Sequence, residues 1–323
     1  MIQDEAPVLV PRPSTTHFRD LDGMRGVLSL GVALFHFGLN AFFERQFGWH
    51  GLSLRLCVDV FFLLSGYVLT HSVRGGGTNR ARFVYRRFMR LAPVYFVTTV
   101  ALAIALGTMV PPLDWPAASP FTGAQPLNGP AWSICWEFYL PVLAVIAGLR
   151  VPDRLVWPAL IVALFALGWV DRDLATVDGN YFPRAVFGLL AGHLLYRSGA
   201  RCDWPFLPLV VGIVALMALA SYSMFGALLL PPLACVAILA GRRGGSIFGW
   251  RVFQWLGDLS YTLYMAHVPV LLVMLDRFGD AAKANSAAKL AGLAVAIVLA
   301  LALTVLVERP GIRLGRYWPA ARA

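Results

Sequence analysis

The chain has 323 residues, of which 59% are hydrophobic and only 14% are charged. Soluble domains carry about 25% charged residues, so this sequence lacks the charge needed to cover an aqueous surface. The net charge of +10 comes almost entirely from arginine, because Lys283 and Lys289 are the only lysines. These arginines lie in short segments between apolar runs and not on one face of a soluble domain, which excludes a nucleic-acid-binding protein and indicates a membrane protein.

Ten apolar segments approach the length that a membrane-spanning helix needs, which is about 20 residues. They are roughly residues 24–42, 55–73, 92–110, 131–149, 155–170, 183–197, 205–221, 224–240, 252–275 and 287–307. The sequence therefore predicts an all-α integral membrane protein with about ten transmembrane helices. The turn at Tyr222–Met224, between the seventh and eighth segments, is the least distinct.

Three regions follow from this assignment. Residues 1–18 contain three prolines and two acidic residues near the start, so we interpret them as a mobile cytoplasmic tail and not as a signal peptide. Residues 19–310 form the predicted transmembrane domain, and residues 311–323 a basic cytoplasmic tail. No internal repeat of fixed period divides the domain.

Arginine is concentrated in every second connection between the apolar segments. The even-numbered connections and the C-terminal region contain Arg74, Arg80, Arg82, Arg86, Arg87, Arg90, Arg150, Arg154, Arg197, Arg201, Arg242, Arg243, Arg251, Arg309, Arg313, Arg316 and Arg322. The odd-numbered connections are much poorer, and residues 112–129 contain no lysine or arginine. Because basic residues accumulate on the cytoplasmic side, we expect both termini in the cytoplasm of a multi-pass cell (inner) membrane protein.

Several ionisable side chains fall inside the apolar segments, where they are costly and mark functional sites. Arg25 and His36 are eleven residues apart, which places them on one helix face about 16 Å apart along the axis. Four further groups fall at a depth similar to that of His36: Asp59, Glu137, Arg184 and His267. Each alone is explained by an interfacial position or a helix–helix hydrogen bond, but together they favour a polar site.

Arg86, Arg87 and Arg90 cluster at the cytoplasmic start of one helix, on the same side as Arg25. Two interpretations remain open, namely topology with lipid headgroup contact and phosphate binding. A basic inner site can hold a phosphorylated donor, and a long thin donor arm spans the distance to the deeper group near His36.

Smaller features have local interpretations. The four cysteines, Cys57, Cys135, Cys202 and Cys235, lack metal-binding spacing and fit small packing residues. Gly188-x3-Gly192 suggests close helix packing. The sequence shows no serine or cysteine paired with a base. Ser65 and Ser133 are possible nucleophiles, but we expect Ser65 to bond the backbone near Gly66.

Seven ordered motifs resemble those of the membrane acyltransferase type 3 family, from about Leu21 to Pro310. They are Leu21-Asp22-Gly23-x-Arg25-Gly26 with Arg-x10-His ending at His36, the stretch Val58–Thr70, Tyr85–Tyr95 with Arg87-x2-Arg90, Asn128-x-Pro130-x-Trp132-Ser133-x3-Glu137, Phe182-x-Arg184-x2-Phe187, Gly257-x2-Ser260-Tyr261-x2-Tyr264-x2-His267 and Glu308-Arg309-Pro310. Each motif alone is weak evidence, whereas the ordered set is specific.

The resemblance implies a ten-helix enzyme that takes an acyl group, commonly acetyl, from cytoplasmic acyl-CoA. The acceptor is a hydroxyl on an extracytoplasmic or lipid-linked glycan, or in some members a small molecule. The resemblance also implies that His36 is the catalytic base, that Arg25, Arg87 and Arg90 lie near the donor, and that Glu137 and Arg184 line the reaction site. Many members have an additional C-terminal hydrolase-like domain, and we expect this chain to be a member without one.

The resulting hypothesis needs acyl-CoA as co-substrate and no metal. CoA phosphates bind Arg25, Arg86, Arg87 and Arg90, and His36 removes the acceptor proton while Glu137 or Asp59 orients its ring. The residues expected to contact substrate are Trp132, Ser133, Arg184, Tyr264 and His267. We favour direct transfer over an acyl-enzyme.

Two other classes of protein remain. A secondary transporter or flippase would use the same buried polar groups for proton relay, although the sequence shows neither inverted halves nor matched broken spans. A non-catalytic scaffold leaves His36 and Glu137 unexplained.

Overall fold

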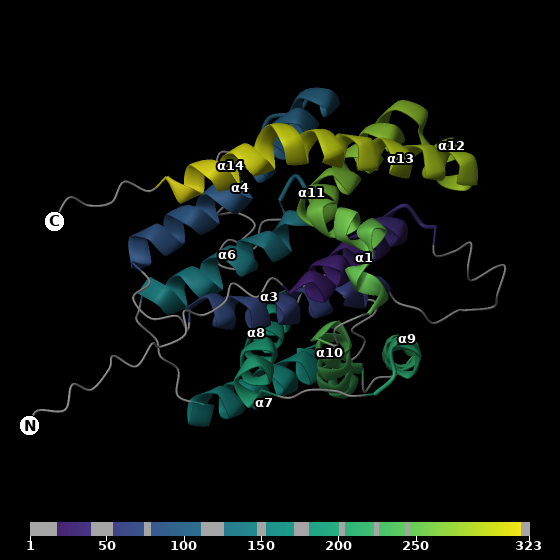
Figure 1. The fold of residues 1–323 in the computed structure, drawn as a ribbon. Coiled ribbons are helices and arrows are strands. Elements are labelled where there is room, and N and C mark those ends of the chain that lie inside the picture. The colour runs from purple at the N-terminus through teal and green to yellow at the C-terminus, as the bar shows by residue number, and fades with distance from the viewer. Residues whose placement is uncertain are drawn as a thin grey trace, which may run out of the picture.

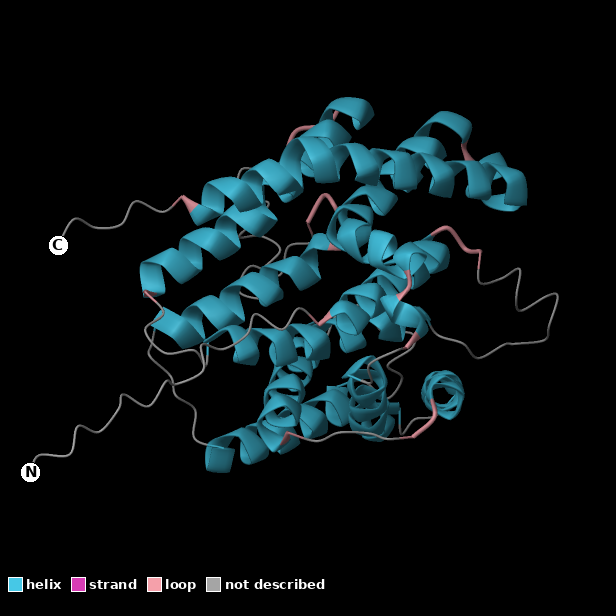
Figure 2. Cartoon of the chain, in the orientation of Figure 1, coloured by secondary structure: helices cyan, strands magenta, loops and turns pink. Residues whose placement is uncertain are grey.

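The computed structural model describes most of the chain as helix. The described residues are 18–39, 54–73, 79–110, 126–146, 153–170, 181–199, 204–222, 226–242 and 246–317. No strand occurs among them (Figure 2), so the predicted all-α class is confirmed for these residues.

The helices follow the predicted apolar segments in chain order (Figure 1). The first half contains α1 (Arg19–His36), the 3-10 turn η1 (Leu54–Leu56), α3 (Cys57–Val73), α4 (Arg80–Leu106), α6 (Ala131–Ile146) and α7 (Asp153–Val170). The second half contains α8 (Tyr181–Ser198), α9 (Phe206–Tyr222), α10 (Gly226–Arg242), η2 (Ile247–Gly249), α11 (Arg251–Phe278), α12 (Asp280–Ala284), α13 (Ser286–Leu303), the π-helical turn η3 (Thr304–Glu308) and α14 (Arg309–Arg316).

Within the described ranges, three helical stretches are long and apolar enough to cross a membrane, namely Arg80–Leu106, Arg251–Phe278 and the continuous run Ser286–Arg316. Five shorter apolar helices accompany them: Cys57–Val73, Ala131–Ile146, Arg154–Ala166, Leu207–Leu216 and Leu229–Leu239. Large apolar side chains on the outer helices are exposed, such as Phe165 at 74%, Ile104 at 76% and Leu306 at 72%. Such surfaces suit contact with lipid. Ten transmembrane helices, cytoplasmic termini and the three regions of the chain remain predictions.

Helix α1 ends earlier than the sequence predicted. The apolar segment was expected to continue to residue 42, but the last helical residue is His36. Gly38 has a φ of 64°, the Gly38 amide donates to Phe35, and the Leu39 amide donates to Leu34. These bonds form a Schellman motif, which glycine favours because it lacks a Cβ. His36 therefore occupies the final turn of α1. The predicted Tyr222–Met224 turn includes residues 223 and 224, which lie outside the described residues.

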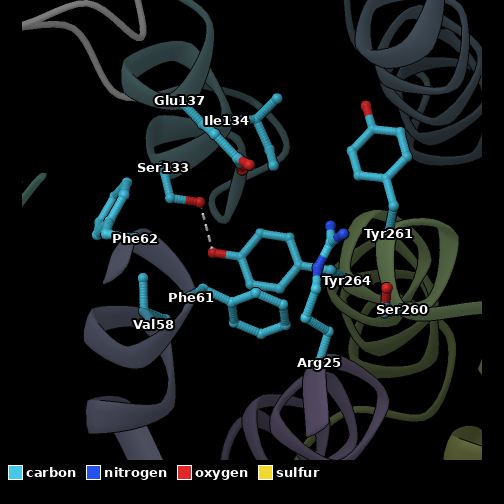
Figure 3. A pocket seen from close by; sticks show the side chains of 10 residues that line it. All are labelled: Arg25, Val58, Phe61, Phe62, Ser133, Ile134, Glu137, Ser260, Tyr261 and Tyr264. Atoms are coloured by element: carbon cyan, nitrogen blue, oxygen red, sulfur yellow. Dashed lines mark hydrogen bonds between the residues drawn. The ribbon is translucent and has the colours of Figure 1, made fainter. Parts of the chain in front are cut away.

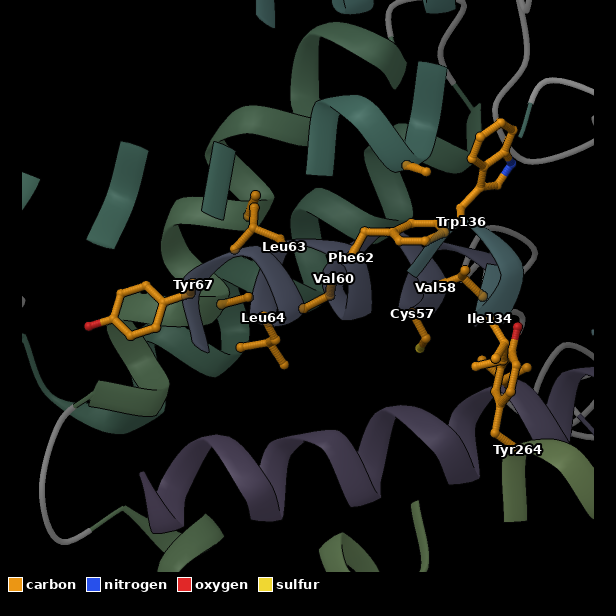
Figure 4. Packing of buried hydrophobic residues seen from close by; sticks show 14 of the residues in the cluster. Cys57, Val58, Val60, Phe62, Leu63, Leu64, Tyr67, Ile134, Trp136 and Tyr264 are labelled. Atoms are coloured by element: carbon orange, nitrogen blue, oxygen red, sulfur yellow. The ribbon is translucent and has the colours of Figure 1, made fainter. Parts of the chain in front are cut away.

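Glycines bring α3 and α8 into close contact. A Cβ on Gly192 would overlap the Leu63 carbonyl oxygen, and one on Gly66 would overlap the Leu189 carbonyl oxygen. Gly188 packs against Phe62, where an added Cβ would lie 2.5 Å from the Phe62 Cβ. The close packing predicted from Gly188-x3-Gly192 is thus confirmed. Figure 4 shows the buried apolar side chains along α3, which belong to the main core cluster.

The predicted packing role of the cysteines holds in part. Cys57 and Cys135 are buried, whereas Cys235 is exposed. Cys202 lies outside the described residues.

Candidate functional site

Two adjoining cavities lie between α1, α3, α4, α6 and α11. The tyrosine-side cavity is lined by Arg25, Val58, Phe61, Phe62, Ser133, Ile134, Glu137, Ser260, Tyr261 and Tyr264 (Figure 3). The arginine-side cavity is lined by Arg25, Leu64, Ser65, Val68, Leu69, Ser72, Arg87, Arg90, Leu91, Glu137 and Tyr261. Arg25, Glu137 and Tyr261 line both cavities, so the two spaces meet at these side chains.

The backbone of α6 fixes Arg87 at this junction. In a regular helix the Glu137 carbonyl would accept the amide hydrogen four residues later, but that residue is Pro141, which has none. Arg87 supplies the missing donors: its Nε lies 2.9 Å from the Glu137 carbonyl oxygen, and a terminal nitrogen also donates to it. The Arg87 guanidinium lies 3.9 Å from the Glu137 carboxylate. A proline in one helix thereby creates the binding position for an arginine in another.

Ser65 bonds Glu137 and not the local backbone as the sequence suggested. Its Oγ donates to Glu137 Oε1 at 2.5 Å, and it is Thr70 whose hydroxyl donates to the Gly66 carbonyl at 2.7 Å. Ser65 sits on the α3 face turned toward α6, where it lines the arginine-side cavity. The predicted backbone bond was wrong because the sequence did not show that α6 brings a carboxylate to this face.

The start of α6 and the residues just before it build the far wall of the tyrosine-side cavity, together with Tyr264 of α11. Ser133 Oγ and Tyr264 OH lie 2.8 Å apart, and both hydroxyls lie within hydrogen-bond distance of the Pro130 carbonyl, at 3.1 and 3.2 Å. Trp132 is half-buried and packs against Phe62 with ring centroids 5.8 Å apart. Of the three residues predicted to contact substrate here, Ser133 and Tyr264 line the cavity and Trp132 does not.

A second proline-freed carbonyl lies nearby on α11. Pro269 removes the amide that would bond the Met265 carbonyl, and Asn128 Nδ2 donates to that carbonyl at 3.0 Å. Asn128 is fully buried, and its Oδ1 has no hydrogen-bond partner among the described residues. This tie holds the segment before α6 against α11.

Asp59 and Arg184 form a buried ion pair. Arg184 Nε and a terminal nitrogen donate to the two Asp59 carboxylate oxygens at 2.9 and 2.6 Å, and both residues are at most 7% exposed. Such bidentate geometry is strong and directional. Neither residue lines either cavity. The pair instead joins α3 to α8.

His36 lies next to His267. His36 Nδ1 is 3.0 Å from the Val32 carbonyl oxygen and 3.2 Å from His267 Nε2, while His267 Nδ1 is 3.1 Å from the Leu263 carbonyl oxygen. His36 is exposed and lines neither cavity, whereas His267 is fully buried. The His267 ring lies 5.7 Å from that of Tyr264, which lines the tyrosine-side cavity.

The expected orienting role of Glu137 or Asp59 toward His36 needs correction. The Glu137 carboxylate accepts from Ser65 and faces Arg87, and the Asp59 carboxylate binds Arg184. Both carboxylates thus bind residues other than His36. The sequence indicates the depth of a side chain in the membrane but not the rotation of its helix, so it could not show these partners. His267 takes the position beside His36.

The predicted donor arginines divide into two groups. Arg25, Arg87 and Arg90 line the arginine-side cavity, and in Figure 3 Arg25 extends from α1 into the space between Tyr261 and Tyr264. The Arg25 Nε is buried without a hydrogen-bond partner among the described residues. Arg86 is exposed and lies outside the cavity, beside α14.

Two features of the site were not assigned a role from the sequence. Tyr261 lines both cavities and donates its hydroxyl to the Leu91 carbonyl. Glu308 is 7% exposed at the end of the π-helical turn η3, faces Arg25 and Arg90, and its Oε2 has no hydrogen-bond partner within the described part of the chain. Single π-helical turns inside longer helices often accompany functional sites, but such a turn has no clear sequence signal.

The outer apolar helices and the enclosed, arginine-lined space define a membrane protein with an internal polar site. The family model described as "Acyltransferase domain" matches residues 18–309. The chain belongs to the acyltransferase 3 family, as its motifs predicted.

Relatives are similar over most of the chain. The exopolysaccharide production protein ExoZ of Rhizobium meliloti (strain 1021) is 28% identical over 291 residues, covering 80% of this chain and 90% of that protein. Acyltransferase MdmB of Streptomyces mycarofaciens is 27% identical over 381 residues, covering 96% of both chains. The peptidoglycan O-acetyltransferase OatA of Listeria monocytogenes is 23% identical over 322 residues, covering 80% of this chain and 50% of OatA. No solved structure gave a significant match.

Proposed function

We propose that this protein is an O-acyltransferase that moves an acyl group, with acetyl the first expected, from cytoplasmic acyl-CoA to a hydroxyl of an extracytoplasmic or lipid-linked glycan. The observation that carries the proposal is the arginine-side cavity, where Arg25, Arg87 and Arg90 surround a space that adjoins the tyrosine-side cavity. The family membership supports the reaction class. The names of ExoZ and OatA support a polysaccharide acceptor.

Donor binding is assigned to the arginine-side cavity. Arg25, Arg87 and Arg90 provide guanidinium donors for the phosphates of CoA, and such charge-assisted bonds fix an anionic ligand. Arg86, which lies outside the cavity, contacts the exposed end of the donor. The narrow space that continues past Arg25 and Tyr261 is suited to the thin pantetheine arm, with Ser133 and Tyr264 at its far wall.

The transfer itself is assigned to His36. Neutral His36 takes the proton of the acceptor hydroxyl as its oxygen attacks the thioester carbonyl. The carbon–sulfur bond then breaks, and protonated His36 returns the proton to the sulfur, so that CoA leaves as the thiol. The exposed position of His36 at the end of α1 leaves its ring accessible to an acceptor from outside the cavity. Asp59 and Arg184 stabilise the bundle beside this route.

The test uses cells that lack the gene, with and without a plasmid-borne copy. Mass spectrometry of their surface glycans should show ester-linked acyl groups only with the intact gene. Membranes supplied with radiolabelled acetyl-CoA should label the same glycans, and His36→Ala should abolish labelling while the protein still inserts. Identical glycans in both strains and no labelling would overturn the proposal. Movement of labelled substrate across vesicles without any transfer would instead support the transporter class.

A further inference from the structure

We infer that His267 is a positioning residue that, together with the Val32 carbonyl, holds the Nδ1 hydrogen of His36 and so directs its second nitrogen toward the acceptor. The inference rests on the proposed function, because it gives His36 the role of general base. It replaces the acceptor contact expected for His267 from its depth in the membrane. His267 is fully buried, so its effect on the reaction passes through His36.

The hydrogen bonds define which nitrogen of His267 carries the hydrogen. A backbone carbonyl only accepts hydrogen bonds, so the 3.1 Å contact between His267 Nδ1 and the Leu263 oxygen requires a hydrogen on Nδ1. In the neutral ring the other nitrogen, Nε2, then carries a lone pair. His267 therefore presents an acceptor to His36.

The same reasoning fixes His36. Its Nδ1 lies 3.0 Å from the Val32 carbonyl oxygen and 3.2 Å from the His267 lone pair, and both of these groups accept. The hydrogen of neutral His36 must then reside on Nδ1, where the two acceptors share it. In this neutral ring the lone pair lies on Nε2, and the proposed reaction uses this nitrogen to take the proton of the alcohol. The Leu263 carbonyl thus orients the His267 ring, and the His267 ring orients the His36 ring.

His267 also stabilises the ring after it has taken the proton. Protonated His36 keeps its Nδ1 hydrogen bonded to Val32 and His267 while Nε2 holds the new hydrogen. The proton does not pass on to His267, because a charge on a fully buried imidazole is strongly disfavoured. His36 also lies in the last turn of α1, where the helix dipole favours a positive charge. A neutral histidine here does the orienting work that a carboxylate does in other catalytic histidine arrangements.

The two rings come from α1 and α11, which are held in close register by glycines. A Cβ on Gly26 would overlap the backbone at Gly257, and one on Gly257 would lie 2.5 Å from the Asp22 carbonyl oxygen. Ser29 also donates to the Ser260 carbonyl at 2.7 Å. The close helix pair fixes the separation of His36 and His267 independently of either side chain.

The test compares two substitutions at position 267 in membranes supplied with radiolabelled acetyl-CoA and the host glycan fraction. His267→Leu removes the acceptor and should lower kcat by about 100-fold, the effect of losing catalytic alignment. The KM for acetyl-CoA should stay within about twofold, since His267 lines neither cavity. His267→Gln offers a carbonyl acceptor and should recover at least about tenfold of the loss.

A matched control separates this role from general packing. His193 also makes a helix–helix hydrogen bond, from its Nδ1 to Thr70 at 3.0 Å, but lines neither cavity. His193→Leu should lower thermal stability without lowering kcat, whereas His267→Leu should lower kcat even at temperatures where it remains folded. Nitrogen NMR of isotope-labelled histidine should show His36 protonated on Nδ1 in the wild type.

The outcomes distinguish failure of the His267 positioning role from failure of the proposed acyltransferase function. An active wild type, an inactive His36→Ala and a fully active His267→Leu would overturn the positioning role alone. Equal kcat losses in the Leu and Gln variants, or a His36 ring protonated on Nε2, would overturn it as well. A wild type without any transfer would instead contradict the proposed function.

Discussion

Replacing Pro141 by alanine is expected to weaken donor binding without destabilising the protein. The substitution restores the amide hydrogen that a regular helix would offer to the Glu137 carbonyl, so Arg87 must compete for an acceptor that it now holds. A hydrogen bond involving a charged group contributes about 1.5–3 kcal/mol. If this competition lowers the contribution of Arg87 to the free energy of CoA binding by about 1.4 kcal/mol, the Kd for CoA rises about tenfold. Proline costs about 3 kcal/mol in a helix interior, so Tm should stay level or rise.

The assay is calorimetric titration of purified protein with CoA, together with thermal unfolding in the same detergent. Pro158→Ala is the matched control, because Pro158 also lies inside a helix, α7, but lines neither cavity. Arg87→Met should weaken binding by itself, and adding Pro141→Ala to it should change Kd no further. An unchanged Kd in the single Pro141 variant, or equal additive effects in the double variant, would refute the reasoning.

Further predictions concern the packing around the cavities. Asp59→Asn should lower the free energy of unfolding by about 3–5 kcal/mol because the buried Arg184 loses the negative charge of its carboxylate partner; thermal unfolding measures this, and an unchanged Tm would contradict it. Gly192→Leu should destabilise by about 1–3 kcal/mol or more in the same assay, since its Cβ overlaps the α3 backbone, whereas Gly212→Leu, which has open space, should not. Asn128→Ala should cost about 1–3 kcal/mol through the carbonyl it leaves unbonded, and wild-type stability in that variant would argue against the bond.

The positions of the long helices could be predicted because each apolar segment must satisfy its own backbone hydrogen bonds in lipid. Each predicted segment does coincide with a described helix. Their ends were harder to place. The apolar residues continue beyond Gly38, so hydropathy extended the first segment to residue 42, while the backbone conformation of this one glycine ends α1 at His36. Local turn chemistry outweighed composition at that point.

The depth of the site residues in the membrane could be predicted from the sequence, but their interaction partners could not. The sequence placed His36, Asp59, Glu137, Arg184 and His267 at a similar depth, and residues at equal depth in neighbouring helices can meet. The structure pairs Asp59 with Arg184 and His36 with His267. The sequence could not show which pairs form, since pairing depends on how each helix is rotated and which helices are neighbours. Glu137 illustrates the difference: its depth suggested a partner for His36, yet its carboxylate bonds Ser65.

Two prolines in the sequence do indicate where a helix carbonyl needs a donor from another segment. Pro141 follows Glu137 by four residues and Pro269 follows Met265 by four, and in both cases another segment supplies the missing donor, from Arg87 or Asn128. The residue four positions before a proline inside a membrane helix thus has a carbonyl that requires another donor. The identity of the partner still depends on the tertiary structure.

The use of a carbonyl has a consequence for the charge of the cavity. A carboxylate in direct contact would hold Arg87 equally well but would neutralise it, and the nearest one, on Glu137, lies 3.9 Å away. The carbonyl orients the guanidinium while leaving its positive charge available. Arg25 lines the same space with a buried Nε that lacks a hydrogen-bond partner among the described residues, and Arg90 lines it from its exposed position on α4. Glu137 and Glu308 offset part of this positive charge. The remaining charge favours an anionic ligand, which fits the phosphorylated donor that we propose.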